Sequence, residues 1–452
     1  MAETQEFAIY WHMCHKLAKS ERILEIKRDK YIADLVGRMG NGMVKVVTGI
    51  RRCGKSYLLL NLFEKHLRSV GVDDSHIIEV VLDDDANEEL RDPKALSGYI
   101  RSRIGDGGGV YYVIIDEVQY AISRDELRSR DDPPRLYGVL NGLLRLPNVD
   151  VYITGSNSKL LSTDVMTEFR GRGDEVRIHP LSFAEFMRGF NGDANQGWRD
   201  YAVFGGMPLV LSMRTREQKM AYLTNLFAEA YFRDIIERNG IEKTQELEDV
   251  VNVLASNIGS LTSFSKLRAT FKSVLHTDIS DHTIAAYVGF LEDAFVVNEA
   301  VRYSVRGRRY IGSPKKYYFE DVGLRNARLG FRQLDEPRIM ENVVYNELRA
   351  RGFFVDVGTI NARWRKDGVQ VREQLEVDFV ANQGDKRYYV QVAQRLDDPG
   401  KEEQEKRSLK AIPDGFKKII VVRDALAPHY DNDGYLIIGL TDFLLDRNSL
   451  EL

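Results

Sequence analysis

The sequence predicts an α/β protein whose first domain is a mostly parallel β-sheet with helices on both faces. Two observations predict this fold class. Short runs of β-branched residues recur along the first 180 residues, and segments with a helical spacing of apolar residues lie between them. Such alternation is typical of parallel sheets, whose faces are covered by the connecting helices. The expected strands are Val44–Thr48, Ile77–Leu82, Tyr111–Asp116, Val151–Thr154 and Val176–His179, and the helices between them include Tyr57–Ser69 and Leu136–Leu146.

The first expected strand leads directly into a glycine-rich motif. The run from Val44 reads VKVVTGIRRCGKS and matches Gly-x-x-x-x-Gly-Lys-Ser. Two glycines let such a loop turn back so that its N–H groups converge on phosphate oxygens. The lysine then approaches the β- and γ-phosphates, the serine hydroxyl binds Mg²⁺, and the following helix directs its positive end at the anion. We therefore predict a P-loop NTPase fold that binds ATP and Mg²⁺ through Gly49, Ile50, Arg51, Arg52, Cys53, Gly54, Lys55, Ser56 and Tyr57.

One residue of this loop carries chemistry of its own. Cys53 lies among the loop N–H groups and close to Lys55, and positive surroundings lower the pKa of a thiol. We expect Cys53 to react as a thiolate and to be protected by bound ATP, with Cys14 as the comparison. Two cysteines are too few for a disulfide framework or a cysteine-rich zinc site, and they are typical of a protein in a reducing cytoplasm.

An acidic pair ends a later hydrophobic strand. The run from Tyr111 reads YYVIIDE, which places Asp116 and Glu117 at the carboxyl end of that strand. Asp116 is the candidate ligand for Mg²⁺, through water, because Mg²⁺ keeps much of its hydration shell. Glu117 is placed to orient or deprotonate the attacking water. Adjacent acids at a strand end also cap helices or lie in solvent, and that alternative stays open.

Polar residues follow the strand Val149–Thr154. A side chain there would sit between the first and third strands and reach the γ-phosphate or its water. Asn157 is the first candidate and Ser156 the alternative, and either can also cap a short helix. Arg170 and Arg172 precede the last strand, where an arginine can reach a neighbouring subunit's nucleotide and stabilise transition-state charge. A solvated surface arginine is the simpler alternative for each.

Together these segments resemble the AAA+ superfamily, and more closely a widespread prokaryotic group of AAA ATPases with an additional C-terminal domain. The resemblance rests on the runs VTGIRRCGKSY, IIDEVQ, ITGSNSKLLS, RGRGDEVRIHPLSFAEF and FGGMP, and towards the C-terminus on LEVDFV and VQVAQR. It implies a central phosphate-loop strand with Asp116 and Asn157 on its neighbours. It also implies that Asn157 is the sensor, and that Arg170 or Arg172 is an arginine finger in a homo-oligomer.

Beyond Ala184 the pattern changes to helices. A long amphipathic helix is expected near Lys219–Glu237, and residues 245–318 read as three helices and a hairpin, with Ser280 capping the last helix. This order predicts a winged helix. Cations on its hairpin would neutralise DNA phosphates with little base readout, while packing against the ATPase domain or another subunit is the equal alternative. The cations are Arg302, Arg306, Arg308, Arg309, Lys315 and Lys316, with Tyr303 and Tyr310 between them.

The last part of the chain returns to an α/β order and resembles the restriction-endonuclease-like fold. A helix with Glu347 precedes a strand with Asp378. In active members of that fold the next strand carries an acid and a lysine, but here the two positions hold Gln391 and Ala393. We therefore expect a nuclease-like fold that has lost cleavage and serves binding or assembly. A solvated Asp378 is the alternative.

Two to four domains are expected, because 452 residues exceed one ordinary core, and the changes of pattern divide the chain into five regions. The sequence has no apolar run long enough to span a bilayer and no secretory signal, so we expect a cytoplasmic protein without membrane contact. The net charge of −4 gives no general attraction to nucleic acid. The regions are a helical extension (1–26), an ATPase core (27–183), a helical lid (184–244), a winged helix (245–334) and a nuclease-like domain (335–452).

Three functions are consistent with these motifs. The leading hypothesis is an ATPase whose nucleotide state drives a conformational change in the later domains, with nucleic acid as the partner. The second is a nucleotide-dependent switch or scaffold that binds a protein and turns over slowly. The third is an ATP-dependent nuclease. Stimulation of hydrolysis by DNA favours the first, and stimulation by a protein alone favours the second.

Overall fold

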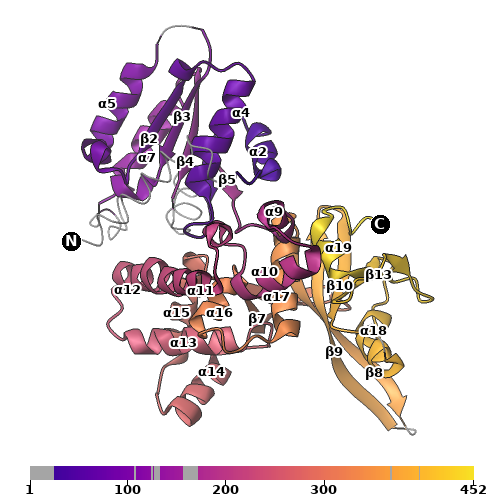
Figure 1. The fold of residues 1–452 in the computed structure, drawn as a ribbon. Coiled ribbons are helices and arrows are strands. Elements are labelled where there is room, and N and C mark those ends of the chain that lie inside the picture. The colour runs from indigo at the N-terminus through magenta and orange to yellow at the C-terminus, as the bar shows by residue number, and fades with distance from the viewer. Residues whose placement is uncertain are drawn as a thin grey trace.

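The computed structural model describes residues 25–105, 108–123, 126, 133–155, 172–366, 369–396 and 398–452. Figure 1 shows an N-terminal sheet between helices, a helical body next to it, and a C-terminal sheet from which a long hairpin projects. The projecting hairpin consists of β8 (Phe354–Lys366) and β9 (Val369–Gln383). Among the described residues, none of the helices combines the length and the apolar character that a membrane span requires.

The N-terminal sheet contains five parallel strands in the order β2-β3-β4-β1-β5. The predicted fold class, a parallel sheet in a P-loop arrangement, is confirmed. The expectation that Asp116 lies on a neighbour of the phosphate-loop strand is wrong, because β4 pairs with both β1 and β3 and so separates them. The strands are β1 (Val44–Thr48), β2 (Ile77–Val81), β3 (Tyr111–Asp116), β4 (Val149–Thr154) and β5 (Gly173–Arg177).

Helices cover both faces of this sheet. Successive side chains of β3 point to opposite faces, as in any strand. Tyr112 and Ile114 pack with α2 and the helix over residues 55–69, whereas Val113 and Ile115 pack with α5 and α7. The helices are α2 (Asp29–Val36), α3 (Lys55–Tyr57), a π-helical stretch (Leu58–Phe63), α4 (Glu64–Ser69), α5 (Pro93–Arg103) and α7 (Arg135–Leu143), with 3₁₀ turns at Asp74–His76, Asp85–Arg91 and Val118–Ala121.

The last strand of this sheet ends earlier than the sequence predicts. The prediction extended it to His179, but β5 ends at Arg177. The backbone of His179 forms hydrogen bonds with side chains and not with a neighbouring strand. Its N–H donates to the Tyr31 hydroxyl at 3.2 Å, and its carbonyl oxygen accepts from Arg28 Nη2 at 2.8 Å. The chain therefore leaves the sheet at residue 178 and turns towards the helical body.

The helical body follows the predicted pattern. The long amphipathic helix is present over residues 216–239, with a π-helical centre. Ser280 caps the last helix before the hairpin, because its hydroxyl accepts from the Thr283 N–H at 3.1 Å. The elements are α9 (Phe183–Gly189), α10 (Ala194–Phe204), a 3₁₀ turn (Pro208–Ser212), α11 (Arg216–Asn225), a π-helical stretch (Leu226–Phe232), α12 (Arg233–Asn239), α13 (Thr244–Ser256), α14 (Phe264–Thr270), a π-helical turn (Phe271–Leu275) and α15 (Asp281–Asp293).

The second sheet has eight strands in the order β12-β13-β11-β10-β9-β8-β6-β7. The hairpin expected as a wing is part of it, because β6 pairs in parallel with β8 through Arg302 and Val357. The sheet thus runs across the boundary expected at residue 335. Its elements are β6 (Val297–Ser304), β7 (Arg309–Phe319), α16 (Val322–Arg328), α17 (Glu336–Ala350), β8, β9, β10 (Lys386–Ala393), α18 (Pro399–Lys410), β11 (Lys417–Val422), β12 (His429–Tyr430), β13 (Leu436–Gly439) and α19 (Leu440–Leu445).

A buried carboxylate joins the N-terminal sheet to the second sheet. Glu320 follows β7, is 4% exposed, and accepts from Arg177 at 2.9 Å and from His179 Nδ1 at 2.5 Å. The Asn298 amide donates to it at 2.6 Å. Burial alone would raise the pKa of Glu320, but Arg177 and His179 outweigh it and hold the pKa well below its ordinary value. The residues that end β5 are therefore fixed by charge to the C-terminal half of the chain.

Replacing Glu320 with Ala should cost up to about 3–5 kcal/mol of unfolding free energy, because the half-buried Arg177 and the buried Asn298 amide would lose the carboxylate that they contact. Urea unfolding, followed by circular dichroism, measures this loss. Glu237→Ala is the matched control, since it removes a carboxylate from a pair with Arg233 on the helix surface. It should leave the midpoint unchanged. A Glu320→Ala midpoint equal to that of the wild type would contradict the role of the junction.

Candidate phosphate and metal site

The loop between β1 and α3 lies very close to the backbone of the segment that follows β5. Gly49 has a φ of 140°, and a Cβ at this position would lie 2.2 Å from the Ile178 carbonyl oxygen. Gly54 has a φ of 102°, in the region that favours glycine, and it caps the helix that follows. The two glycines of the motif are therefore required by the backbone, one by close contact and one by conformation.

The lysine of the motif lies inside the loop. Lys55 is 4% exposed, and its ammonium group donates to the carbonyl oxygens of Gly49 at 2.9 Å and Ile50 at 3.2 Å. These partners are neutral, so the charge has no counter-ion among them. A buried cation whose contacts are neutral carbonyls has a strong electrostatic preference for an anion.

The serine of the motif and the acid at the end of β3 are brought together. Ser56 Oγ lies 3.1 Å from Asp116 Oδ1, and the Thr154 hydroxyl donates to the same oxygen. The other oxygen of this carboxylate, Oδ2, is buried without a hydrogen-bond partner among the described residues. Burial and the charge of Glu117 raise the pKa of Asp116 to about 7. A hydroxyl and an unsatisfied carboxylate oxygen at one place suit a hydrated Mg²⁺, because oxygen is the ligand that this ion prefers.

Glu117 adopts a strained backbone conformation beside this pair. Its φ of 54° and ψ of 52° are left-handed, which is uncommon for a residue with a side chain. The Glu117 N–H donates to Thr154 Oγ1 at 3.0 Å, and its carboxylate accepts from the Gln119 amide. Strain of this kind persists only where neighbouring contacts hold it, and it is concentrated at functional sites.

Thr154 is a site residue that the sequence analysis missed. It ends β4, is fully buried, and is bonded to both Asp116 and Glu117. A signal was available, since a single polar residue ends the hydrophobic run VYIT. The prediction placed the polar role at Asn157 or Ser156, and these two residues lie outside the described part of the chain.

Arg28 is a second residue that the sequence did not identify. Its buried guanidinium group donates to the carbonyl oxygens of Cys53 at 3.0 Å and His179 at 2.8 Å, and it pairs with Glu185 at 3.0 Å. It therefore ties the phosphate loop to the segment that leaves β5. No local pattern distinguishes this arginine from its exposed neighbours in the sequence.

The expectation of a reactive Cys53 is wrong. The side chain is fully buried, with Sγ at 3.7 Å from the Ile178 carbonyl oxygen. Burial raises the pKa of the thiol, and the nearby charges of Lys55 and Arg28 only oppose this effect. The thiol is a packing group beneath the loop.

The two arginines of the loop differ in their surroundings. Arg51 pairs with Asp234 at 3.3 Å, and its carbonyl oxygen accepts from the Tyr231 hydroxyl at 2.5 Å. These contacts connect the loop to the long helix over residues 216–239. Arg52 is exposed and has a φ of 64°. Ile50 is fully buried and Tyr57 is half-buried.

The candidate arginine fingers are placed in part. Arg172 is exposed immediately before β5, and its carbonyl oxygen accepts from the Val44 N–H at 2.9 Å. Its backbone is therefore fixed at the end of the sheet while its side chain faces solvent. Arg170 lies outside the described residues.

The cations of the β6–β7 hairpin divide into two groups. Arg306, Arg308 and Arg309 are exposed. Lys315 pairs with Glu299 at 2.5 Å. Lys316 is 3% exposed and bonded to carboxylates, so its assignment as a contact for DNA phosphates is wrong. Arg302 is also buried, and its guanidinium group donates to the carbonyl oxygens of Ser313 and Pro314.

The acids of the nuclease-like part have an internal cation. Lys316 Nζ lies 2.9 Å from Glu341, 2.7 Å from Glu376 and 4.0 Å from Asp378. Glu347, which the sequence paired with Asp378, instead pairs with Arg351 at 2.7 Å. The reason is helical spacing: Glu347 and Arg351 are four residues apart, whereas Glu341 is on the turn of α17 that faces β7. Within the described ranges, no group of three or more His, Cys, Asp or Glu side chains is arranged to hold a metal ion.

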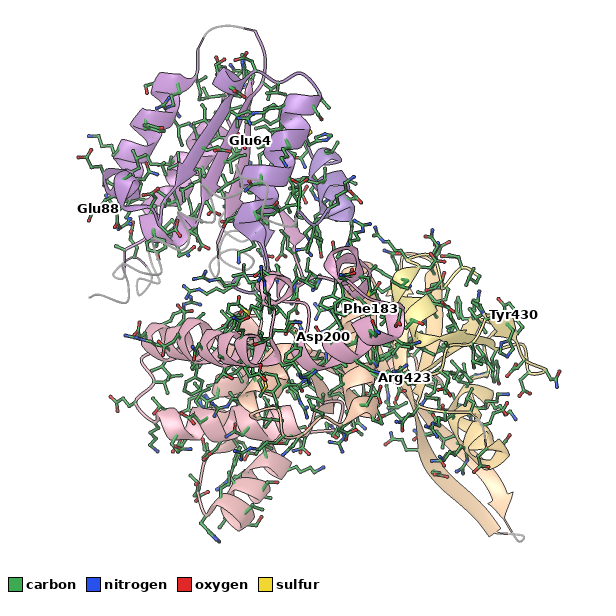
Figure 2. All side chains as sticks on the ribbon, in the orientation of Figure 1. Glu64, Glu88, Phe183, Asp200, Arg423 and Tyr430 are labelled. Atoms are coloured by element: carbon green, nitrogen blue, oxygen red, sulfur yellow. The ribbon has the colours of Figure 1, made fainter. Side chains whose placement is uncertain are left out.

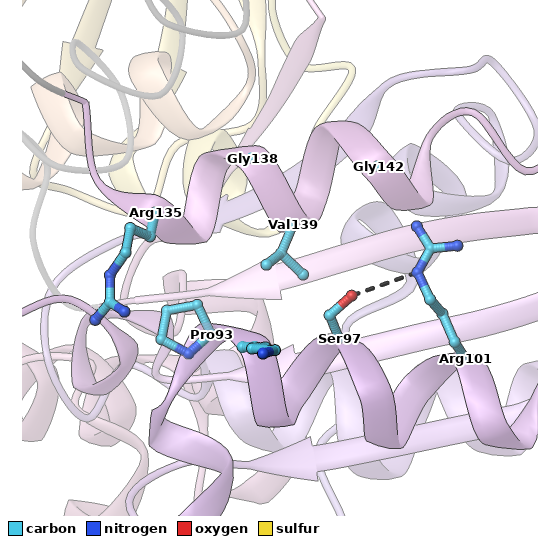
Figure 3. Close-up of a pocket in the computed structure, with 8 residues that line it drawn as sticks. Pro93, Ser97, Arg101, Arg135, Gly138, Val139 and Gly142 are labelled. Atoms are coloured by element: carbon cyan, nitrogen blue, oxygen red, sulfur yellow. Dashed lines mark hydrogen bonds between the residues drawn. The ribbon is translucent and has the colours of Figure 1, made fainter.

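A groove of about 330 Å³ lies between α5 and α7, on the face of the sheet opposite the phosphate-loop helix (Figure 3). Arg101, Arg135 and Lys94 line it, together with two glycines of α7. Arg101 Nε donates to Ser97 Oγ at 3.4 Å, and Arg135 pairs with Glu126 at 3.2 Å. None of its lining residues belongs to the phosphate loop or to the acidic pair, so the groove is separate from the site.

Two family models match the chain. A model described as an AAA domain matches residues 41–187, and a model described as a domain of unknown function matches residues 195–335. A protein of Haemophilus influenzae, described as uncharacterised, is 30% identical over 428 residues, which is 93% of this chain and 98% of the relative. An uncharacterised protein of Methanocaldococcus jannaschii is 27% identical over 387 residues, which is 82% of this chain and 79% of the relative.

Solved structures give weaker likenesses. A Walker-type ATPase of Pyrococcus abyssi has 17% identity and a TM-score of 0.48, over 68% of this chain and 96% of that one. The Orc1 protein of Aeropyrum pernix, in complex with DNA, has 12% identity and a TM-score of 0.29, over 68% of this chain and 92% of that one. At these TM-scores the likenesses carry no weight for function.

Thr154→Val should slow ATP hydrolysis by roughly tenfold while ATP affinity stays near that of the wild type. The methyl group keeps the shape, but the Glu117 N–H and Asp116 lose their hydroxyl partner, which costs about 1–3 kcal/mol where a buried group is left unsatisfied. Steady-state phosphate release and binding of a fluorescent ATP analogue measure the two effects. Thr154→Ser, which keeps the hydroxyl, is the control. A Val variant as fast as the Ser variant would contradict this role.

Proposed function

The chain belongs to the same family as its Haemophilus influenzae relative and carries an AAA domain, and from this premise we propose that it binds ATP with Mg²⁺ and hydrolyses it. One observation carries the proposal. The buried cation of Lys55 and the unsatisfied oxygen of Asp116 flank Ser56, so a site for an anion and a site for a divalent cation adjoin. ATP with Mg²⁺ is the ligand that presents both charges together.

The residues present fit this ligand. The loop N–H groups and Lys55 would hold the β- and γ-phosphates, and Ser56 and Asp116 would hold Mg²⁺. When bound, Mg²⁺ offsets negative charge on the phosphates. Glu117 takes the proton of the attacking water, and Thr154 holds both acids in register by its hydroxyl. The Gln119 amide orients the Glu117 carboxylate before the reaction begins.

The finer parts of the proposal concern assembly. We place Arg172 or Arg170 at the nucleotide of a neighbouring subunit in a homo-oligomer, with Asn157 as the sensor of the γ-phosphate. The exposure of Arg172 at the end of the sheet supports this assignment. Analytical ultracentrifugation across protein concentrations tests it, since a monomer at all concentrations with undiminished ATPase rate contradicts a finger from another subunit.

We propose nucleic acid as the partner that the ATPase cycle acts on. The exposed Arg306, Arg308 and Arg309 support phosphate contact. The units that move are the regions 27–183, 184–244 and 245–452, because the sheet that runs from β6 into β8 joins 245–334 to 335–452. The contacts of Arg51 with Asp234 and Tyr231 favour a nucleotide-dependent switch as the second candidate, because they tie the loop to the long helix without any requirement for fast turnover. The pairing of Lys316 with the acids supports a nuclease-like unit without cleavage.

Lys55→Ala should abolish ATP binding, because the loop loses its side-chain cation. Glu117→Gln should keep ATP affinity while slowing turnover by roughly 10²–10⁴-fold, the range usual for a general base. Isothermal titration with ATP and Mg²⁺ gives the affinities, and phosphate release gives the rates. Lys65→Ala, which removes an exposed lysine from α4 outside the loop, is the matched control for Lys55. An equal loss of affinity in the Lys55 and Glu117 variants would refute the division of roles.

Replacing Arg306, Arg308 and Arg309 together with Ala should weaken binding to a DNA duplex and reduce its salt dependence by up to about 3 phosphate charges. Fluorescence anisotropy at several salt concentrations gives the slope. Arg233→Ala, which removes an exposed arginine from the long helix, is the control. If the affinity of the wild type for DNA does not vary with salt, the hairpin only packs within the protein and does not contact phosphates.

A further inference from the structure

We propose that one face of the C-terminal sheet is a platform for single-stranded nucleic acid. The platform is the set of six residues Tyr303, Tyr310, Phe354, Asp356, Arg387 and Phe416. The inference rests on the proposed function, because it names the form of nucleic acid that the protein recognises and the residues that meet the bases.

Register places the platform residues on one side of the sheet. Directly paired residues of antiparallel strands point to the same face. Phe354 of β8 pairs with Asn382 of β9, which pairs with Arg387 of β10. At the other end of the sheet Tyr303 of β6 pairs with Tyr310 of β7. The Arg387 guanidinium group lies 5.2 Å from the Tyr303 ring. Phe354 and Arg387 therefore lie on the same face of the sheet as Tyr303 and Tyr310, and α18 packs against this face as well.

Three aromatic rings of the platform face solvent. Phe354 is 78% exposed, Tyr310 is 65% exposed and Phe416 is 43% exposed. Single exposed apolar residues are ordinary, but a group of aromatic rings on one face marks a binding surface. The rings of Tyr303 and Tyr310 have centroids 5.4 Å apart at an interplanar angle of 61°, so the exposed tyrosine is supported from beneath by the buried one.

A fixed cation lies between the rings. The Arg387 guanidinium group is 5.2 Å from the centroid of Tyr303 and 5.3 Å from that of Phe416, and Arg387 Nε donates to Asn382 Oδ1 at 2.7 Å. Alternating aromatic faces and guanidinium planes are the surfaces on which unpaired bases stack. In a duplex the base faces are already stacked on each other, so this arrangement favours a single strand.

Asp356 is a buried carboxylate that offers an acceptor to a base edge only when the base displaces Tyr310 from it. It is 9% exposed, lies beside Tyr310, and its Oδ2 has no hydrogen-bond partner among the described residues. A carboxylate repels phosphates but accepts from the exocyclic amino groups of bases.

Arg308 at the β6–β7 turn is exposed and can contact the phosphates of the strand. Arg306 beside it donates to the carbonyl oxygens of Asn361 and Ala411, which are neutral and leave its charge uncompensated. We therefore assign the bases to the platform and the phosphates to the hairpin turn. A protein partner would not require these two surfaces of different chemistry.

The experiment measures fluorescence anisotropy of labelled single-stranded DNA, single-stranded RNA and a DNA duplex of one mixed sequence with the full-length protein. Tyr310→Ala combined with Phe354→Ala should weaken single-strand binding at least tenfold, since two rings on which bases stack are removed. The salt dependence should stay unchanged, because no phosphate contact is removed. Tyr430→Ala is the matched control: this tyrosine is 54% exposed on the far edge strand of the same sheet (Figure 2) and should have no effect.

The outcomes separate the platform from the proposed function. Single-strand binding that survives the Tyr310 and Phe354 changes, or binding restricted to the duplex, overturns the platform and leaves the phosphate contact of Arg306, Arg308 and Arg309 standing. Failure of all three nucleic acids to bind overturns the platform and the nucleic-acid partner together. ATP hydrolysis measured in the same samples still tests the ATPase proposal on its own. Asp356→Asn should change the preference among single-stranded homopolymers, and an unchanged preference removes Asp356 from the platform.

Discussion

The close approach of Gly49 to the Ile178 carbonyl oxygen is the contact on which the rest of the structure depends. It fixes the phosphate loop against the chain where that chain leaves β5. The residues on either side of Ile178 are the ones that bind Glu320, and Arg28 holds His179 and the loop at once. A shift of the loop is therefore transmitted within three residues to the C-terminal half. Packed contacts of this kind change between discrete arrangements and do not deform gradually.

The strands that the sequence predicted best are those with sharp chemical boundaries. Val44–Thr48 ends at a glycine loop and Tyr111–Asp116 ends in two acids, and both were predicted to the residue. The place of β4 between β1 and β3 agrees with the expectation that its polar end sits between the first and third strands, whereas the resemblance placed β3 beside β1. Which strand lies beside β1 depends on how the crossovers pack. The burial of Lys316 could not be predicted either. In the sequence Lys316 and Arg308 are both cations of one basic hairpin, and only the pairing across the sheet shows that Lys316 is buried and Arg308 is exposed. The roles assigned to Asn157 and Arg170 stay predictions.

Lys316 also changes the reason for expecting no cleavage. In the sequence two groups are missing, because Gln391 stands in place of an acid and Ala393 in place of a lysine. In the structure Glu341 and Glu376 share one cation from their own chain, the Lys316 ammonium group, which also lies 4.0 Å from Asp378. Burial lowers the pKa of Lys316, but the neighbouring carboxylates outweigh this and raise it above its ordinary value, so the ammonium stays charged. The ion pairs of Lys316 with these acids hold β7 to α17 and β9 as a structural joint.

The parallel pairing of β6 with β8 has a consequence for how the chain is made. The match to the domain of unknown function ends at residue 335, and β8 begins at Phe354. During synthesis the β6–β7 hairpin therefore leaves the ribosome with one backbone edge unpaired, and it stays so until Val357 and its neighbours follow. Open strand edges of this kind are the places where chains pair wrongly with one another. The family boundary at residue 335 therefore divides one structural unit. The sheet of that unit can form completely only after the residues on both sides of the boundary have been synthesised.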